Sequence, residues 1–254
     1  MIKNIKFKRP SIKGVEIKRC SYSEQSYKEH LHEELSIGYI EKGSTVVDFN
    51  SKNYLFTEGD GIIIPPYVSH ICRPTDVDYW QFVMMYIDIS YYQGEINVPR
   101  KLTDIELTKC KDFFGLLTGK YADFEVENTL IDLLITCTLI NKKSNGPRPD
   151  KVLENIYNYI KFNYLENITL ENLETIFNIN KFTIIRGFKS IYNTTPSSFQ
   201  LQLKVAYSKG LLARGMNILD VCNEAGFYDQ AHFTREFKKA NGKTPLQYQK
   251  DILS

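Results

Sequence analysis

The stretch Cys222–Pro245, CNEAGFYDQAHFTREFKKANGKTP, decides how the last part of the chain folds. Gly226 can adopt the positive φ that ends a helix, and Asp229 is a good cap for the start of the next helix. In that next helix Phe233 and Phe237 lie four residues apart, so they share one face, which we expect to be buried. The stretch therefore predicts a helix, a tight turn and a second helix, the helix-turn-helix arrangement.

The same pattern occurs a second time, 49 residues earlier. The matching positions spell R-x-F-K, then T-P, then an aromatic residue. They are Arg186, Phe188, Lys189, Thr195, Pro196 and Phe199 in the first copy and Arg235, Phe237, Lys238, Thr244, Pro245 and Tyr248 in the second. A self-match at a fixed period indicates one structural unit built twice. We expect the first helices of the two units at 170–177 and 218–225, and the second helices at 181–191 and 230–240. In the first copy Ile184 and Phe188 are the expected buried pair.

A single helix is expected between the two units. Thr195 can cap this helix, Pro196 suits its first turn, and Ser197–Ala213 can then continue without a break. At 1.5 Å per residue such a helix is roughly 25 Å long. A rigid spacer of that length can hold the two second helices about 34 Å apart, which is one turn of B-DNA, so that each enters a successive major groove.

The duplicated region is more basic than the rest of the chain. The 254 residues together carry a formal net charge of only +2. Between Lys181 and Lys243, ten basic and four acidic residues give a local net charge of +6, and phosphate contacts need such local charge. Exposed Lys and Arg often mean only a solvated helix face, but the duplication favours binding to double-stranded DNA.

Residues 217–250 resemble the second-unit signature of the AraC/XylS family of bacterial transcription regulators. The shared elements are the pair Val221-Cys222 in the first helix, G-F in the turn, and then F-x-R-x-F-K, G and T-P-x-x-Y. Residues 168–199 are a looser match to the first unit. The resemblance covers about the last 100 residues and implies a DNA-binding domain of seven helices.

By motif position, the resemblance assigns residues of the two second helices to DNA. The residues facing bases would be Phe182, Ile185, Arg186, Gln230, Ala231 and Arg235. The residues near phosphates would be Thr183, Lys189, Thr234 and Lys238 or Lys239. Arginine can read a guanine edge with two hydrogen bonds, and glutamine can read adenine.

The first unit departs from the family pattern at three positions. Glu174 stands where a small apolar residue is usual, and Ile185 replaces a typically polar residue. Gly187 lies inside the second helix, where glycine costs about 1 kcal/mol against alanine. We therefore expect the first helix-turn-helix unit to bind DNA more weakly than the second.

Residues 1–98 have the pattern of β structure. Short runs rich in β-branched and aromatic residues, VEIKR, LSIGYIE, STVVDF, GIIIP and YWQFVMMYID, alternate with the turn signals EKGS, NSKN, TEGDG and IPPY. Such spacing predicts a sandwich or barrel. The segments EHLHEELSIGYIEKG and EGDGIIIPPYVSH look like the cupin-type sensor module common at the N-terminus of AraC relatives. The fold class is thus α+β, with a cupin-like β-barrel before an all-α domain.

Polar and aromatic side chains of the expected barrel are candidates for binding a small-molecule effector. They are His30, His32, Tyr39, His70, Trp80 and Tyr86. Strand alternation would place His30 and His32 on one face. Metal-binding cupins add a glutamate after H-x-H, where this chain has Ser36 or Ile37, so we predict no metal and no cofactor. The alternative function, a metal-dependent cupin enzyme with a helical appendage, needs His30, His32 and His70 to hold a metal.

Between the barrel and the duplicated units, apolar residues recur at the helical period. One face would carry Leu130, Leu133, Leu134, Cys137 and Ile140. The resemblance implies that these helices pair with a second copy to form a homodimer, and packing on the chain's own barrel explains the face equally well. The expected organisation is a barrel at 1–98, a helical dimerisation segment at 99–143, a linker at 144–150 and a DNA-binding domain at 151–254.

Composition limits the remaining possibilities. No secretory signal is visible, and the longest apolar run, Leu130–Ile140, is too short to span a bilayer. The five cysteines are scattered and suit reduced thiols in a cytoplasm. No nucleophile arrangement or phosphate loop is legible, so we predict a regulator and no enzyme. Its partners would be DNA, an effector, a second copy and, for an activator, RNA polymerase, without a membrane.

Overall fold

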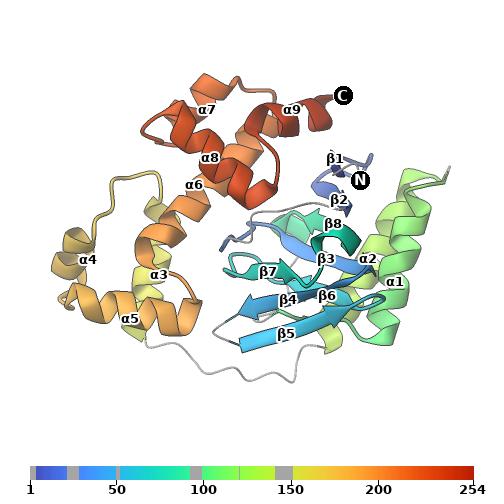
Figure 1. Cartoon of the computed structure of the whole chain (residues 1–254), viewed down its shortest axis with the longest axis horizontal. Helices are drawn as coiled ribbons and strands as arrows, with labels where there is room; N and C mark the ends of the chain where they lie inside the picture. Colours follow the sequence, from blue (N-terminus) through green and yellow to red (C-terminus); the bar gives the residue numbers. More distant parts are fainter. Residues whose placement is uncertain (1–3, 22–28, 50–51, 92–98, 120, 141–150) are drawn as a thin grey trace.

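The computed structural model describes residues 4–21, 29–49, 52–91, 99–119, 121–140 and 151–254. A β-rich part is followed by helices that surround two of its sides (Figure 1). The strands are β1 Asn4–Lys8, β2 Val15–Ser21, β3 Leu35–Lys42, β4 Ser44–Phe49, β5 Lys52–Thr57, β6 Gly61–Ile64, β7 Ile71–Pro74, β8 Gln81–Ile87 and β9 Arg100–Lys101. The α-helices are α1 Asp104–Leu116, α2 Asp123–Ile140, α3 Lys151–Asn163, α4 Leu170–Phe177, α5 Lys181–Tyr192, α6 Pro196–Ala213, α7 Ile218–Glu224, α8 Gln230–Asn241 and α9 Pro245–Leu253.

The strands form two antiparallel sheets. The larger has the order β1-β2-β8-β3-β6-β9 and the smaller the order β5-β4-β7. Alternation along β3 sends Ser36 and Ile40 into a cavity that the two sheets share, whereas Leu35 and Ile37 belong to the core on the opposite face. The expected β-rich sensor module is thus a pair of facing sheets with a cavity between them.

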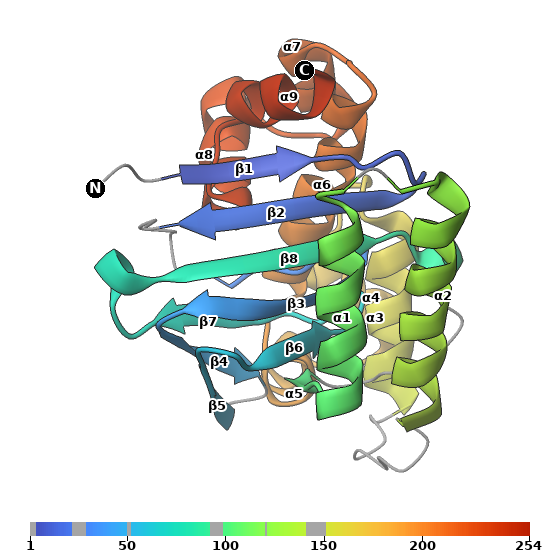
Figure 2. The same cartoon turned by 90° about the vertical axis from the view of Figure 1, so that its right-hand side faces the viewer.

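Helices α1 and α2 cover the outer face of the larger sheet (Figure 2). The predicted apolar face of α2 is buried there, because Leu130, Leu133 and Cys137 are each 0% exposed. The side chain of Ile140 lies outside the described residues. Packing on the chain's own sheet therefore accounts for this face, the second of the two explanations that the sequence left open.

Both predicted helix-turn-helix units are present, as α4–α5 and α7–α8, with α6 as the single helix between them. Thr195 caps α6, Asp229 caps α8 by accepting a hydrogen bond from the His232 N–H, and Gly226 has a φ of +66°. The two expected anchor pairs are fully buried. They are Ile184 and Phe188 in α5 and Phe233 and Phe237 in α8.

Three strands were not predicted from the sequence: β1, β5 and β9. Strand β5 begins at Lys52, the third residue of the predicted turn segment NSKN. This strand lies at the edge of its sheet and exposes most of its side chains, so it lacks the apolar alternation of a half-buried strand. Strand β9 falls inside the segment that we expected to be helical, and it adds only two residues to β6.

The predicted linker at 144–150 lies outside the described residues. All five cysteines are free thiols, as expected. None of the helices in the described part of the chain is long and apolar enough to cross a membrane.

Candidate functional site

The residues predicted to face DNA bases lie on the outer sides of α5 and α8. Phe182, Arg186, Gln230, Ala231 and Arg235 are exposed, and Ile185 is half-buried. Phe182 is 62% exposed, which is unusual for a phenylalanine and leaves its ring available to a partner. The buried anchor pairs described above fix the rotation of each helix about its axis, and that rotation turns these side chains outward.

The residues predicted to contact phosphates differ in how freely they are presented. Thr183, Lys189 and Lys238 are exposed, and Thr234 is half-buried. Lys239 forms an ion pair with Glu236 and lines a groove that also includes Glu29 and His30 of the β-rich part. Lys239 therefore lies at the boundary with the β-rich part, away from the exposed side chains of Gln230, Arg235 and Lys238 on α8.

Two departures of the first unit have structural roles that the sequence did not reveal. A Glu174 carboxylate oxygen accepts a hydrogen bond of 3.3 Å from the backbone N–H of Lys181, at the start of α5. A Cβ added at Gly187 would lie 2.5 Å from Leu153 Cδ1, so glycine permits the close packing of α5 on α3. Glu174 and Gly187 therefore stabilise the first helix-turn-helix unit, although both depart from the family pattern.

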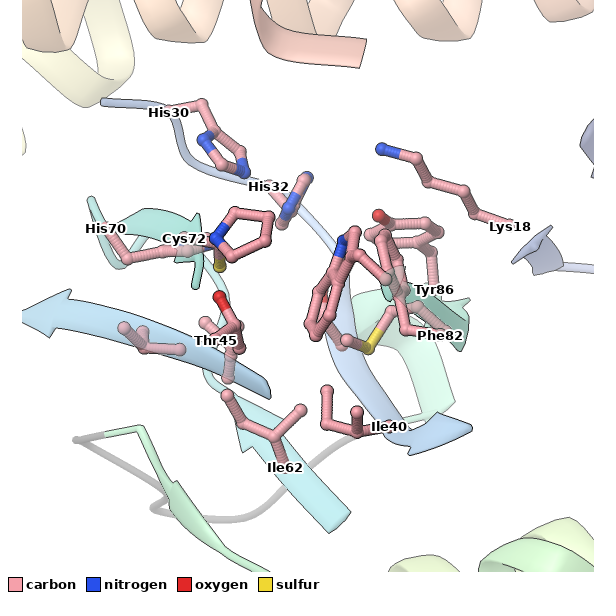
Figure 3. Close-up of a pocket in the computed structure, with 16 residues that line it drawn as sticks. Lys18, His30, His32, Ile40, Thr45, Ile62, His70, Cys72, Phe82 and Tyr86 are labelled. Atoms are coloured by element: carbon pink, nitrogen blue, oxygen red, sulfur yellow. The ribbon is translucent and has the colours of Figure 1, made fainter. Parts of the chain in front are cut away.

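Five of the six predicted effector-binding residues line one cavity between the two sheets (Figure 3). They are His30, His32, His70, Trp80 and Tyr86. The sixth, Tyr39, is absent from the lining, and its ring packs instead on Phe114 of α1. The cavity volume is about 50 Å³, room for a few water molecules and well below the volume of drug-sized ligand pockets, about 300–1,000 Å³. A larger ligand must widen it.

Three imidazole rings meet at one end of this cavity. One ring nitrogen from each of His30, His32 and His70 lies within 4.8 Å of the other two. Burial lowers the pKa of His70 to about 4. Burial, with the neighbouring histidines, also holds the pKa of His32 well below its ordinary range. Both rings are therefore neutral at pH 7.

Three further polar groups line the cavity and were not predicted from the sequence: Lys18, Ser36 and Thr45. The Ser36 and Thr45 hydroxyls are buried and form no hydrogen bond within the described residues. Lys18 is 2% exposed, and its ammonium lies 5.6 and 5.8 Å from the centres of the Phe7 and Phe82 rings. Burial lowers the pKa of Lys18 to about 8. Strand alternation from β2 was the available signal for Lys18, since the next inward position after Glu16 is 18.

A buried ion pair joins the β-rich part to the helices. Lys209 of α6 is 2.8 Å from Glu16 of β2 and 3.2 Å from Glu34. The Tyr248 hydroxyl of α9 donates a hydrogen bond of 2.6 Å to Glu16. The Lys209 ammonium also lies 4.4 Å from the centre of the Tyr86 ring. Because Tyr86 also lines the cavity, one side chain touches both the cavity and the contact between the two parts.

Comparison with known proteins identifies both parts. Residues 13–134 match the family described as "AraC-like ligand binding domain". Residues 173–251 match the family described as "Helix-turn-helix domain". The Bacillus subtilis (strain 168) protein described as the uncharacterized HTH-type transcriptional regulator YbfI is 24% identical over 229 residues, which cover 82% of each chain. The virulence regulon transcriptional activator VirF of Yersinia enterocolitica is 30% identical over 103 residues, 40% of this chain and 37% of VirF.

Solved structures of ToxT from Vibrio cholerae strain SCE256 share the whole fold. A structure of an apo ToxT variant matches with a TM-score of 0.62 at 14% identity and covers 96% of this chain and 100% of that one. Wild-type ToxT bound to unsaturated fatty acid matches with a TM-score of 0.60 at 13% identity and covers 98% of this chain and 96% of that one. The alternative of a metal-dependent cupin enzyme finds no support in these comparisons. With an AraC-like ligand-binding domain followed by two helix-turn-helix units, the chain belongs to the AraC/XylS family and is a DNA-binding transcription regulator.

Proposed function

We propose that this regulator activates transcription from a specific operator in response to a small molecule held between its two sheets. The observation that carries the proposal is the pair of exposed helices α5 and α8, fixed on one continuous helix, α6. Arg186 and Arg235 are the exposed arginines of these helices and would read base edges. Activation is the function named for VirF, and we extend it to this chain together with contact to RNA polymerase.

The effector is proposed to be a small anionic molecule. Lys18 is a buried cation that lines the cavity, and the described residues offer it no ion pair. A buried lysine is rarely left without an anionic partner. The unpaired hydroxyls of Ser36 and Thr45 would accept or donate further hydrogen bonds. The unsaturated fatty acid bound to ToxT also carries a carboxylate and is an anion at neutral pH.

A homodimer is proposed to form through a different face of α2 from the one buried on the sheet. Phe124, Ile131 and Ile135 are 65%, 42% and 52% exposed and lie seven and four residues apart, so they form one stripe. We propose four segments: an effector-binding part at 1–98, dimerisation helices at 99–143, a linker at 144–150 and a DNA-binding domain at 151–254. We assign no catalytic activity, and we place the regulator in the cytoplasm, where its DNA lies.

DNA binding can be tested with the full-length chain and a pool of random-sequence duplexes. After selection of bound duplexes, fluorescence anisotropy on the enriched duplex measures affinity at fixed salt concentration. Arg235→Ala is expected to weaken binding by about 1–3 kcal/mol, roughly 5- to 160-fold, because a bidentate base contact is lost. Arg186→Ala is expected to cost less, since it lies in the weaker unit.

Arg73→Ala is the matched control, because Arg73 is exposed and pairs with Asp48 in the β-rich part. It should bind DNA as the unchanged chain does. Enrichment of no sequence, or equal binding by all three variants, would refute the proposal. Addition of carboxylate-bearing small molecules to the same assay then tests the effector class separately.

A further inference from the structure

The missing glutamate after H-x-H predicts no metal, but three histidines can hold zinc without a carboxylate. We propose that His30, His32 and His70 form a binding site for a divalent transition-metal ion such as Zn²⁺. One ring nitrogen of each histidine lies within 4.8 Å of the other two, and the cluster faces the cavity between the sheets. Three of the four histidines of the chain meet there. Imidazole nitrogen is a preferred ligand of zinc, copper, nickel and iron ions.

The backbone around the three rings is fixed by hydrogen bonds. His30 and His70 exchange two backbone hydrogen bonds of 3.1 and 2.9 Å, which place their rings side by side with centroids 4.4 Å apart. The carbonyl of His32 accepts a hydrogen bond of 2.7 Å from the Tyr67 N–H. The segments that carry the three rings are therefore held together before any ion binds.

A second layer of contacts orients two of the rings. The Nδ1 atom of His70 lies 2.9 Å from the Val68 carbonyl, a contact that fits an Nδ1–H donor and leaves Nε2 as the ligand atom. The ring of His32 packs against Tyr86 with centroids 4.7 Å apart. Outer partners of this kind, which fix the tautomer and the ring direction, are typical of metal-binding histidines.

The rings must move a little to bind an ion. Zinc–nitrogen bonds of about 2.0–2.1 Å in a tetrahedral site place ligand nitrogens roughly 3.3–3.4 Å apart. The present separations of up to 4.8 Å exceed this by about 1.4 Å. Rotation of the rings about their side-chain bonds can close that gap while the hydrogen-bonded backbone stays in place.

Three imidazole ligands would leave a fourth position open toward the cavity. In the described residues no carboxylate or thiolate joins the cluster, although Cys72 lines the same cavity. Structural zinc sites are closed by four protein ligands, whereas sites with three keep a place for water or an external ligand. The unpaired Ser36 and Thr45 hydroxyls and the Lys18 ammonium face the same space. This step rests on the proposed effector cavity: an anionic effector would complete the coordination of the ion.

The test uses the untagged full-length chain, stripped of metal with a chelator that is then removed. Titration with Zn²⁺ in a calorimeter is expected to show one saturable site per chain, and Mg²⁺ should give none. Co²⁺ bound at the same site should give the visible absorption of a tetrahedral nitrogen site. His32→Gln and His70→Gln should each weaken Zn²⁺ binding at least about 100-fold, since even the loss of an outer partner costs about 10- to 100-fold.

His232→Gln is the matched control, because His232 lies in α8 and is the one histidine outside the cluster. It should bind Zn²⁺ as the unchanged chain does, and circular dichroism should show that all variants are folded. Absence of a saturable Zn²⁺ site, or equal binding by the His32→Gln variant, would overturn the proposal. The two proposals can be told apart. If only the metal site is wrong, the chain binds DNA in the anisotropy assay but shows no Zn²⁺ site. If only the proposed function is wrong, the chain binds Zn²⁺ but selects no DNA sequence.

Discussion

Glycine occurs inside two helices of the DNA-binding part, and the surroundings of the two glycines are opposite. A Cβ at Gly187 in α5 would lie 2.5 Å from Leu153 Cδ1 and 3.0 Å from Leu153 Cδ2. A Cβ at Gly210 in α6 would meet nothing within 4 Å. Alanine gains about 1 kcal/mol of helix propensity over glycine at either position. Added volume in a packed site costs about 1–3 kcal/mol, so the balance differs between the two.

We expect Gly210→Ala to raise the free energy of unfolding by about 1 kcal/mol. Gly187→Ala should lower it or leave it unchanged, because displacement of Leu153 offsets the gain in propensity. Urea denaturation followed by circular dichroism measures both. Equal stabilisation by the two substitutions would show that Gly187 is not held by close packing of α5 on α3.

At the scale of elements, Arg100 of β9 ties the edge of the larger sheet to the start of α1. Its guanidinium donates hydrogen bonds of 2.8 and 2.7 Å to the two carboxylate oxygens of Glu106, which is 0% exposed. Glu106 also accepts a hydrogen bond of 2.7 Å from the Thr103 N–H and so completes the cap of α1. Burial alone would raise the pKa of Glu106, but these hydrogen bonds outweigh it and hold the pKa below its ordinary value of 4.5.

Glu106→Gln should lower the free energy of unfolding at pH 7 by about 1.5–3 kcal/mol, the range for a hydrogen bond to a charged group. A depressed pKa contributes stability above the ordinary value, and this contribution is lost as the pH falls through the folded-state pKa. The difference between the two proteins should therefore shrink from pH 7 toward pH 3. Denaturant titrations at several pH values measure it. Glu58→Gln, which removes an exposed carboxylate in the turn between β5 and β6, is the control and should show no such trend. A difference that is constant with pH would contradict this account.

Elements with a strong local signal could be predicted from the sequence. The 49-residue duplication gave both helix-turn-helix units, because caps such as Asp229 and buried pairs such as Phe233 and Phe237 act within one turn or two. The edge strand β5 was missed because its mostly exposed side chains give no local pattern of apolar alternation. The same holds for the cavity: proximity of Lys18 to the histidines depends on strand order, which local patterns do not encode.

At the scale of the whole molecule, the sensor and the DNA-binding part share a buried contact. Lys209 pairs with Glu16, and Glu16 accepts a hydrogen bond from Tyr248. Burial alone would lower the pKa of Lys209, but the carboxylates of Glu16 and Glu34 hold it well above its ordinary value, so the ammonium stays charged. Helix α9 lies beside β1 at this contact (Figures 1 and 2). Since Tyr86 touches both Lys209 and the cavity, a ligand that moves Tyr86 changes the surroundings of this ion pair.

Lys209→Met should therefore loosen the association of the two parts. Removal of one partner from a buried ion pair costs about 3–5 kcal/mol, because the remaining charge, here the Glu16 carboxylate, stays buried and uncompensated. Separation of the parts would let water reach Glu16 and would relieve that cost. Small-angle X-ray scattering should show a larger radius of gyration, and amide hydrogen exchange should accelerate in β1 and α9. Lys204→Met is the matched control on the same helix, because the Lys204 ammonium donates to the Gly226 carbonyl within the DNA-binding part. Equal exchange in the two variants would mean that the apolar contacts between the parts, such as the packing of Phe7 on Tyr248 with ring centroids 5.0 Å apart, hold them together without the ion pair.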